Sequence, residues 1–288
     1  MPSDALRDWL AGQVRSRVVG TSAPERAAEL FDAPGERWFE AGTPICQVHA
    51  DASMFIGGLR ALLLQSLHPL AMAGVAEHSD YRTDPWGRLQ RTADFIAATT
   101  FGPAAEAERA VARVRRVHQH VRGVSDDGRP YSALDPHLLR WVHIAEIDSF
   151  LAAHTHYGRR PLEGSDRDEY VAQTAVVARK LGVPAPPESE RALRDQLRSY
   201  RRELKGTREA REVAQYLLVQ PPMPIAVRPA YLLLGGAAVA LLPRWARAPL
   251  RLPYLPIAER VAIRPAGEVV TRTLRWALSQ RRPAEAPD

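Results

Sequence analysis

Apolar residues along the chain recur mainly at spacings of three and four, and runs that alternate polar with β-branched residues are scarce. Spacings of three and four place side chains on one face of an α-helix, whereas strict alternation would indicate strands. We therefore predict an all-α fold, a single globular helical domain. No internal repeat and no long Gly/Ser-rich linker divides the chain, which supports one domain rather than two.

Proline and glycine mark the ends of the predicted helices. Asp135 and Pro136 supply an N-cap and a first-turn proline, and the pair His68-Pro69 predicts a kink because proline removes a helical hydrogen bond. The predicted helices cover 54–75 with that kink, 87–100, 103–122, 136–157, 165–181, 188–204, 207–218, 229–241 and 268–279. We expect residues 1–43 to wrap the core, 44–245 to form it, and 246–288 to pack on it as an extension with a short disordered tail.

Arginine dominates the positive charge of the chain. The formal net charge is +6 with 39 basic residues, of which only Lys180 and Lys205 are lysines. Acidic residues are interspersed with the arginines, as in 188–195, so the charges indicate solvated helix faces rather than a nucleic-acid-binding stripe. The single cysteine, Cys46, excludes an intramolecular disulfide, a cysteine-rich zinc site and a protein-ligated iron–sulfur cluster.

Two segments bear on membranes and localisation. Residues 1–17 contain charged side chains and lack the continuous apolar core of a signal peptide, so we expect a cytoplasmic protein. The strongest apolar run, 231–242, is shorter than the roughly 20 residues that span a bilayer. We expect a buried helix there and no transmembrane segment; peripheral contact with a membrane surface stays open.

The predicted helix 103–122 carries two histidines on different faces. His118 shares the apolar face with valines at 111, 114, 117 and 121, whereas His120 projects with Arg113 and Arg116. An inward histidine is commonly a hydrogen-bonded core residue, but a neutral imidazole in an apolar pocket is also what axial ligation of haem iron requires. His143, on the stripe 139–143–147–150 of the next helix, poses the same question, and spacing alone decides neither.

A third candidate group lies in the predicted helix 87–100. Arg88, Arg91 and Thr92 share one face at helical spacing. Two arginines there can hold carboxylates by paired hydrogen bonds, and a threonine can donate to an oxygen ligand or to water. Surface arginines would show the same pattern.

Several separated blocks of the sequence resemble one known family in the family's own order. They are 57–69 (GGLRALLLQSLHP), 74–79 (GVAEHS), 84–92 (DPWGRLQRT), 100–102 (TFG), 117–123 (VHQHVRG), Tyr131, 135–136 (DP), 141–143 (WVH) and, more loosely, 228–229 (RP). The chain resembles, over roughly residues 35–245, the oxygenase family that includes the fungal MpaB proteins and the bacterial latex-clearing rubber oxygenases.

The resemblance implies an all-α fold enclosing a haem pocket, with haem b (iron) as cofactor and His118 as its proximal iron ligand. The family's arginine and threonine fall on Arg88 and Thr92. Glu77 is a candidate base that the resemblance does not securely align with a residue of the family. Rubber oxygenases have a lysine before that threonine, able to reach the distal iron position, whereas this chain has Arg91. A guanidinium stays protonated and cannot ligate iron, so the polyisoprene substrate is not carried over.

The sequence therefore predicts a haem-b-dependent oxygenase, an oxidoreductase that acts on an apolar organic substrate with dioxygen. Arg88, Thr92 and Glu77 are the predicted catalytic residues. The predicted cofactor-binding residues are His118, Arg88, Arg91, Thr92 and His143. A non-enzymatic haem-binding carrier or sensor is the main alternative. A metal-free helical hydrolase or lipid-binding protein is a second one, although the chain has no nucleophile-elbow pattern.

Overall fold

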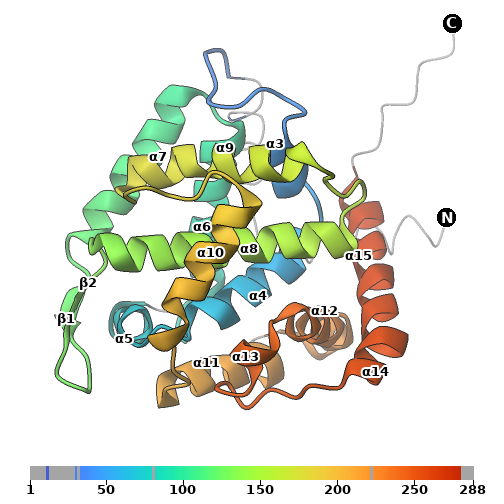
Figure 1. Ribbon diagram of the computed structural model, residues 1–288. Coiled ribbons are helices and arrows are strands. Elements are labelled where there is room, and N and C mark those ends of the chain that lie inside the picture. Colours follow the sequence, from blue (N-terminus) through green and yellow to red (C-terminus); the bar gives the residue numbers. More distant parts are fainter. Residues whose placement is uncertain (1–10, 13–29, 31–32, 80–81, 221–222, 280–288) are drawn as a thin grey trace, which may run out of the picture.

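Helix α8 (Pro136–Tyr157) runs through the middle of the molecule, and the other helices surround it in the computed structural model (Figure 1). The structure describes residues 11–12, 30, 33–79, 82–220 and 223–279. In chain order the remaining elements are α3 (Pro44–His49), α4 (Met54–Gln65), α5 (Pro69–His78), α6 (Pro85–Phe101), α7 (Ala104–His118), β1 (Arg122–Val124), β2 (Pro130–Ser132), α9 (Ser165–Leu181), α10 (Glu190–Ser199), η1 (Tyr200–Arg202), α11 (Arg208–Val219), η2 (Ile225–Val227), α12 (Arg228–Leu241), α13 (Arg244–Arg247), α14 (Pro256–Ala258), the π-helical η3 (Glu259–Ile263) and α15 (Arg264–Leu278). The predicted all-α class is confirmed.

Side-chain caps explain where several helices begin. Asp84 accepts a hydrogen bond from the amide of Gly87 at the start of α6, and Asp135 accepts one from His137 at the start of α8. Ser189 and Thr207 cap α10 and α11 in the same way. Each cap satisfies an amide that the first turn leaves without a helical partner, so these polar residues fix the N-terminal ends.

The main core forms where α4 lies along α8. Buried leucines of α4, including Leu63 and Leu64, pack with Trp141 and Ile144 of α8. A second apolar cluster joins the start of α4 and the end of α8 to α12 and α15, through residues such as Ile56 and Ala237. Because α8 contributes to both clusters, its position in the molecule is fixed. The side chains on the face of α8 that points away from α4 therefore have defined positions as well.

The kink predicted at His68-Pro69 is present, and it separates α4 from α5. The two helices meet at 108°, and Pro69 occupies the first turn of α5, where a missing amide costs nothing. Among the described helices none is by itself long and apolar enough to cross a membrane; α4 and α5 would reach that length only as this bent pair. Much of the apolar surface of α4 is instead buried in the core.

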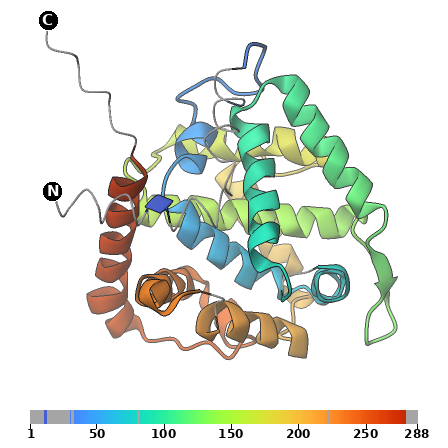
Figure 2. The same ribbon diagram turned by 180° about the vertical axis from the view of Figure 1, so that it is seen from behind.

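The helix predicted for 103–122 is shorter than expected, because α7 ends at His118. The chain then forms a two-stranded antiparallel hairpin in which Arg122 pairs with Ser132 and Val124 with Pro130. The turn between the strands contains Gly128 at φ +81° and is closed by a bond from the amide of Ser125 to the carbonyl of Arg129, 2.9 Å. Both figures show this hairpin projecting beyond α5 and α7 (Figures 1 and 2).

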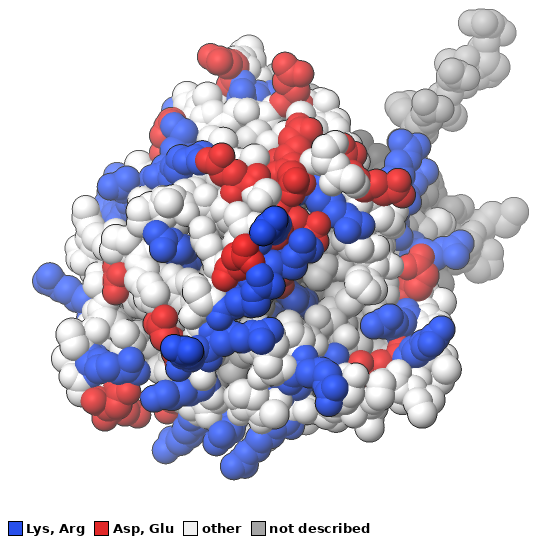
Figure 3. Space-filling view, viewed as in Figure 1, with Lys and Arg blue, Asp and Glu red and all other residues white. Residues whose placement is uncertain are grey.

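The two predicted flanking segments are described only in part. Residues 1–10, 13–29 and 280–288 lie outside the described residues. The stretch 33–43 contributes Phe39 to the main core, and α15 packs along α12. On the face in Figure 3, acidic side chains gather in the upper part and basic ones dominate from the centre to the lower edge. Some of these charges form ion pairs, such as Arg194 to Glu190 at 2.5 Å.

Candidate functional site

His118 is the last residue of α7 and is half-buried. Burial lowers the pKa of its imidazole, so the ring is neutral near pH 7. Within the described residues no hydrogen bond or ion pair engages this ring. A neutral imidazole has a nitrogen lone pair available to a metal ion, and no described residue occupies that nitrogen here.

His120 is exposed. Its Nδ1 is 3.0 Å from the carbonyl oxygen of Arg116, which gives it a structural partner. His118 is thus the more buried of the two histidines, in the order that their positions predicted. The prediction was wrong for Val117, which is 57% exposed although it was expected on the buried face. Helix α7 ends one residue later, at His118, so the predicted apolar face does not continue past this point.

The candidate residues of α6 lie in its first turns. Arg88 is half-buried, and Arg91 and Thr92 are exposed. Arg91 pairs with the N-cap carboxylate of Asp84 at 3.2 Å, and the Thr92 hydroxyl donates to the carbonyl of Arg88 at 3.1 Å. The three residues share a side of the helix as predicted, with Arg91 and Thr92 bonded to groups at the start of their own helix.

Glu77, near the end of α5, is held by the hairpin. The hydroxyl of Tyr131 on β2 donates a hydrogen bond to Glu77 Oε2. Burial, with the carboxylate second, raises the pKa of Tyr131 to about 12, so the phenol keeps its proton. Gly123 on β1 lets the strand approach this pair, since a Cβ there would lie 2.6 Å from the phenol oxygen and 2.9 Å from Glu77 Oε2. The hairpin therefore fixes a carboxylate that would otherwise move freely at the surface.

His143 and Glu146 lie one turn apart on α8. Burial lowers the pKa of His143 to about 4, and its Nε2 is buried without a hydrogen-bond partner. Burial also raises the pKa of Glu146 to about 7. Both side chains nevertheless keep some accessible surface. The ring nitrogen of His143 is thus a buried polar atom with no partner among the described residues, which calls for an explanation.

The contacts of α6 and α7 differ from those of α8. In the described part of the chain α6 packs mainly on α7 and α3, with Ile96 and Phe101 against the main core, and α7 packs on α6 and α9. Figure 2 shows α6 and α7 on the near side of the molecule, with α8 running behind them. His118 belongs to the layer formed by α6 and α7, and His143 belongs to α8. Helices α3 and α9 contact both.

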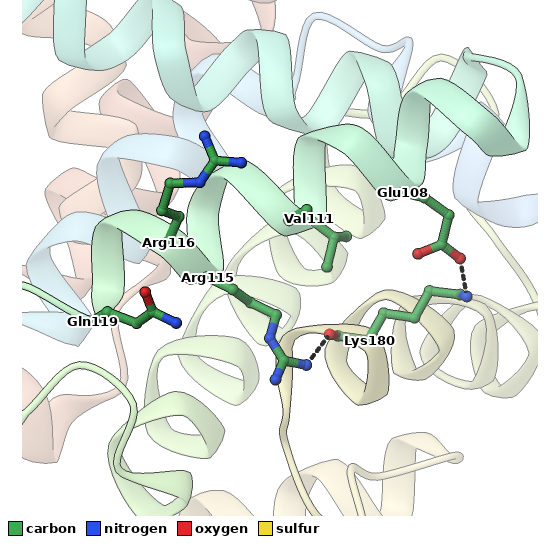
Figure 4. Close-up of a pocket in the computed structure, with 7 residues that line it drawn as sticks. Glu108, Val111, Arg115, Arg116, Gln119 and Lys180 are labelled. Carbon is green, nitrogen blue, oxygen red and sulfur yellow. Dashed lines mark hydrogen bonds and ion pairs between the residues drawn. The ribbon is translucent and has the colours of Figure 1, made fainter.

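The described pocket lies elsewhere, on the outer side of α7 next to α9 (Figure 4). It measures about 400 Å³ and is lined largely by polar and charged side chains. Lys180 donates to Glu108 across it, and Arg115 donates to the carbonyl of Lys180 at 3.2 Å. A shallow surface hollow bridged by an ion pair and a hydrogen bond is unsuited to an apolar substrate, so it is not the candidate site.

Sequence reasoning missed Glu146. The apolar stripe of α8 was drawn through 139, 143, 147 and 150, and a glutamate between these positions passes for a solvent-facing residue. The available signal was its place three residues after His143, which puts both on one face.

A comparison with protein-family models matches residues 46–276 to the family described as ER-bound oxygenase mpaB/B'/rubber oxygenase, catalytic domain. The match extends past residue 245, where we had expected the resemblance to end. No curated protein and no solved structure matches the chain. Because the family model covers most of the sequence, this protein is an enzyme, an oxidoreductase of the MpaB and rubber oxygenase catalytic-domain family.

Proposed function

We propose that this oxygenase binds haem b between the α6 and α7 pair and α8, where His118 would hold the iron, and that it oxidises an apolar organic substrate with dioxygen. The observation that carries the proposal is the neutral, half-buried and unpartnered imidazole of His118 at the end of α7. Family membership supplies the reaction class. The cofactor and the residues that hold it are the proposed part.

The residues present fit haem b. Axial ligation needs a neutral histidine with a free nitrogen, which His118 offers. The buried Nε2 of His143, which has no partner, indicates that α8 borders a space the protein does not fill by itself. No Cys-x-x-Cys-His attachment sequence is present, so the haem would be held without a covalent bond.

Each remaining residue has a defined task in this proposal. Haem b, when bound, supplies a redox-active iron for the oxidation of the substrate by dioxygen. Arg88 would bind a propionate by charge-assisted hydrogen bonds. Thr92 would contact a polar group in the haem pocket, and Arg91, always protonated, would not ligate iron. Glu77, oriented by the Tyr131 hydroxyl, is the proposed proton acceptor.

The apolar character of the substrate is also proposed. It rests on the family, whose description includes rubber oxygenases, and not on a cavity with apolar walls.

The test compares His118→Ala with His120→Ala, expressed with supplemented haem. We expect His118→Ala to lose much of its haem and to shift the Soret band, because the axial nitrogen is gone. His120→Ala should keep the wild-type haem content and spectrum. Free imidazole added to His118→Gly should restore the spectrum by occupying the vacated position. An unchanged spectrum in His118→Ala would refute the assignment, and His143 would be the next residue to test.

A second comparison addresses the propionate contact. Arg88→Ala should weaken haem retention more than Arg113→Ala, which removes an exposed arginine of α7. Equal retention in the two variants would show that Arg88 is only another surface charge.

A further inference from the structure

Two histidines and a glutamate converge away from the proposed haem site, at the junction of α4, α5 and α8. They are His68 at the kink, His137 in the first turn of α8, and Glu203 just after η1. One ring nitrogen of each histidine and one oxygen of the glutamate all lie within 4.8 Å of one another. The segments that carry them are far apart in the sequence.

His68 is the member whose environment is unexplained. Its side chain is only 2% exposed, yet neither ring nitrogen has a hydrogen-bond partner. Its Nε2 lies 3.5 Å from Glu203 Oε2, in a geometry that makes no hydrogen bond. The side chain makes no capping hydrogen bond to α5 either. A buried imidazole normally finds a partner, so this one indicates a group that completes the site.

His137 is oriented for a ligand at its Nε2. The hydroxyl of Tyr200 donates to the carbonyl of His137 at 2.9 Å and lies 3.2 Å from its Nδ1. Because that hydroxyl already uses its proton, its oxygen is left to accept the Nδ1 proton of the imidazole. This leaves Nε2, 2.7 Å from Glu203 Oε2, as the nitrogen to be occupied by a proton or a metal ion. The Tyr200 ring also stacks on the imidazole, with centroids 4.5 Å apart.

Backbone and ring contacts hold the three segments together. The indole nitrogen of Trp141 donates to the carbonyl of Gln65 at 3.0 Å, which ties α8 to the end of α4. The amide of Lys205 donates to the carbonyl of Leu67 at 2.8 Å, which brings Glu203 to the kink. The cluster is therefore largely preorganised, so a ligand would not have to order the chain.

We propose that His68, His137 and Glu203 form a binding site for a divalent transition metal of the zinc class. Two imidazoles and one carboxylate suit zinc rather than magnesium or calcium, which prefer oxygen ligands. Tetrahedral coordination at zinc distances separates ligand atoms by about 3.4 Å. The separations of 3.5 Å and 2.7 Å that Glu203 Oε2 makes with the two imidazoles approach this value from either side. His137 and Glu203 are 45% and 43% exposed, so water can complete the coordination.

The metal would pin the kink to the start of α8 and to the end of η1. It would replace the proton between His137 and Glu203 and give His68 the partner it lacks. This site is independent of the proposed haem site, because the two sites have no residue in common.

The experiment measures Zn²⁺ binding to the full haem-loaded protein after dialysis against EDTA, by calorimetry and by metal analysis. We expect one Zn²⁺ per chain and a higher melting temperature in its presence. Because loss of a group that only supports a ligand typically weakens metal binding by about 10- to 100-fold, Glu203→Gln and His137→Ala should each weaken it by at least roughly tenfold. Both altered side chains are partly exposed, so these variants are expected to fold.

The matched control is His156→Ala, which removes an exposed histidine near the other end of α8. It should bind Zn²⁺ as the wild type does. Haem content should be the same in all four proteins, which separates a failure of this proposal from a failure of the haem assignment. Absence of Zn²⁺ binding, or equal binding by wild type and Glu203→Gln, would overturn the proposal.

Discussion

Gly57 and Gly58 provide a matched test of how closely α4 packs on α8. A Cβ built on Gly57 would lie 3.0 Å from Cδ1 of Phe150, 3.2 Å from the Phe150 Cα and 3.3 Å from the Ala153 Cβ. A Cβ on Gly58, one residue later in the same helix, would meet nothing within 4 Å. The two positions differ in surroundings but share a helical backbone.

The expected magnitudes follow from these distances. Replacing glycine by alanine inside a helix stabilises by about 0.8–1.0 kcal/mol, and Gly58→Ala should gain this amount. Gly57→Ala gains the same helical term but forces the backbones of α4 and α8 apart, because the Phe150 Cα cannot rotate away as a ring can. Overpacking of this kind costs about 1–3 kcal/mol. The difference between the two variants should therefore be about 1–3 kcal/mol in the free energy of unfolding.

Urea denaturation and thermal melting of the two variants measure this difference. At about 2–4 °C per kcal/mol for a chain near this size, Gly57→Ala should melt several degrees below Gly58→Ala. Equal stability of the two variants, or a more stable Gly57→Ala, would refute the close approach of α4 and α8. A changed urea m-value would indicate that unfolding is no longer two-state, and then the midpoints would have to be compared together with the m-values.

Two further predictions concern buried carboxylates. Arg247 and Glu259, 4% and 8% exposed, pair at 2.5 Å; Glu259→Gln should cost about 3–5 kcal/mol because it leaves the guanidinium buried without a counter-charge, whereas the exposed Glu163→Gln should cost almost nothing. Burial opposes ionisation of Glu259, but the hydrogen bonds from Arg247 and the Leu255 amide outweigh it and lower the pKa of this carboxyl group. The stabilisation that the ionised Glu259 gives the fold is therefore present above the ordinary carboxyl pKa. It disappears as the pH falls through the lowered pKa of the folded state. Glu146 has the opposite sign: burial raises its pKa to about 7, so the folded state binds the extra proton and loses stability as the pH rises from about 4.5 towards 7. Glu146→Gln should thus be more stable than the wild type at pH 8 and similar to it at pH 4 in urea denaturation, and a pH-independent difference would contradict the burial of this carboxylate.

The helices of the core were predictable because their apolar spacing and their caps agree. Asp135 and Pro136 set the start of α8, and Gly158 follows its last residue, as expected. The kink at Pro69 followed from the chemistry of proline, although its angle did not. Where local signals and burial point to the same element, the sequence is sufficient.

The end of α7 was not predictable from the same pattern. Val121 continues the apolar spacing of the helix, yet it lies beyond the helix and packs near Gly74, with its Cγ1 3.7 Å from the position of a Cβ there. The apolar spacing correctly indicates that Val121 is partly buried. The hairpin and α5 bury it, rather than a helix packed against a longer α7. The strands themselves are three residues long, too short to show alternation.

The site residues also divide into those that local spacing could predict and those that depend on contacts between distant segments. The direction of His118 followed from its helix face, and its proposed role rests on resemblance to the family. The partners of Glu77 and His68 depend on contacts between segments that no local spacing reports. Tyr131 contacts Glu77 where Gly123 leaves room for it, and Glu203 lies beside His68 where the amide of Lys205 bonds the carbonyl of Leu67.

One local feature serves both proposed sites. The break at Pro69 turns α5 by 108°, which leaves His68 at the junction with α8 and directs the far end of α5, with Glu77, to the hairpin. A continuous helix through residues 54–78 would extend α5 in line with α4, so it could not keep both of these contacts. The proline therefore does more than end a helix, because the angle it permits places the proposed proton acceptor and the proposed metal ligand at opposite ends of one short helix.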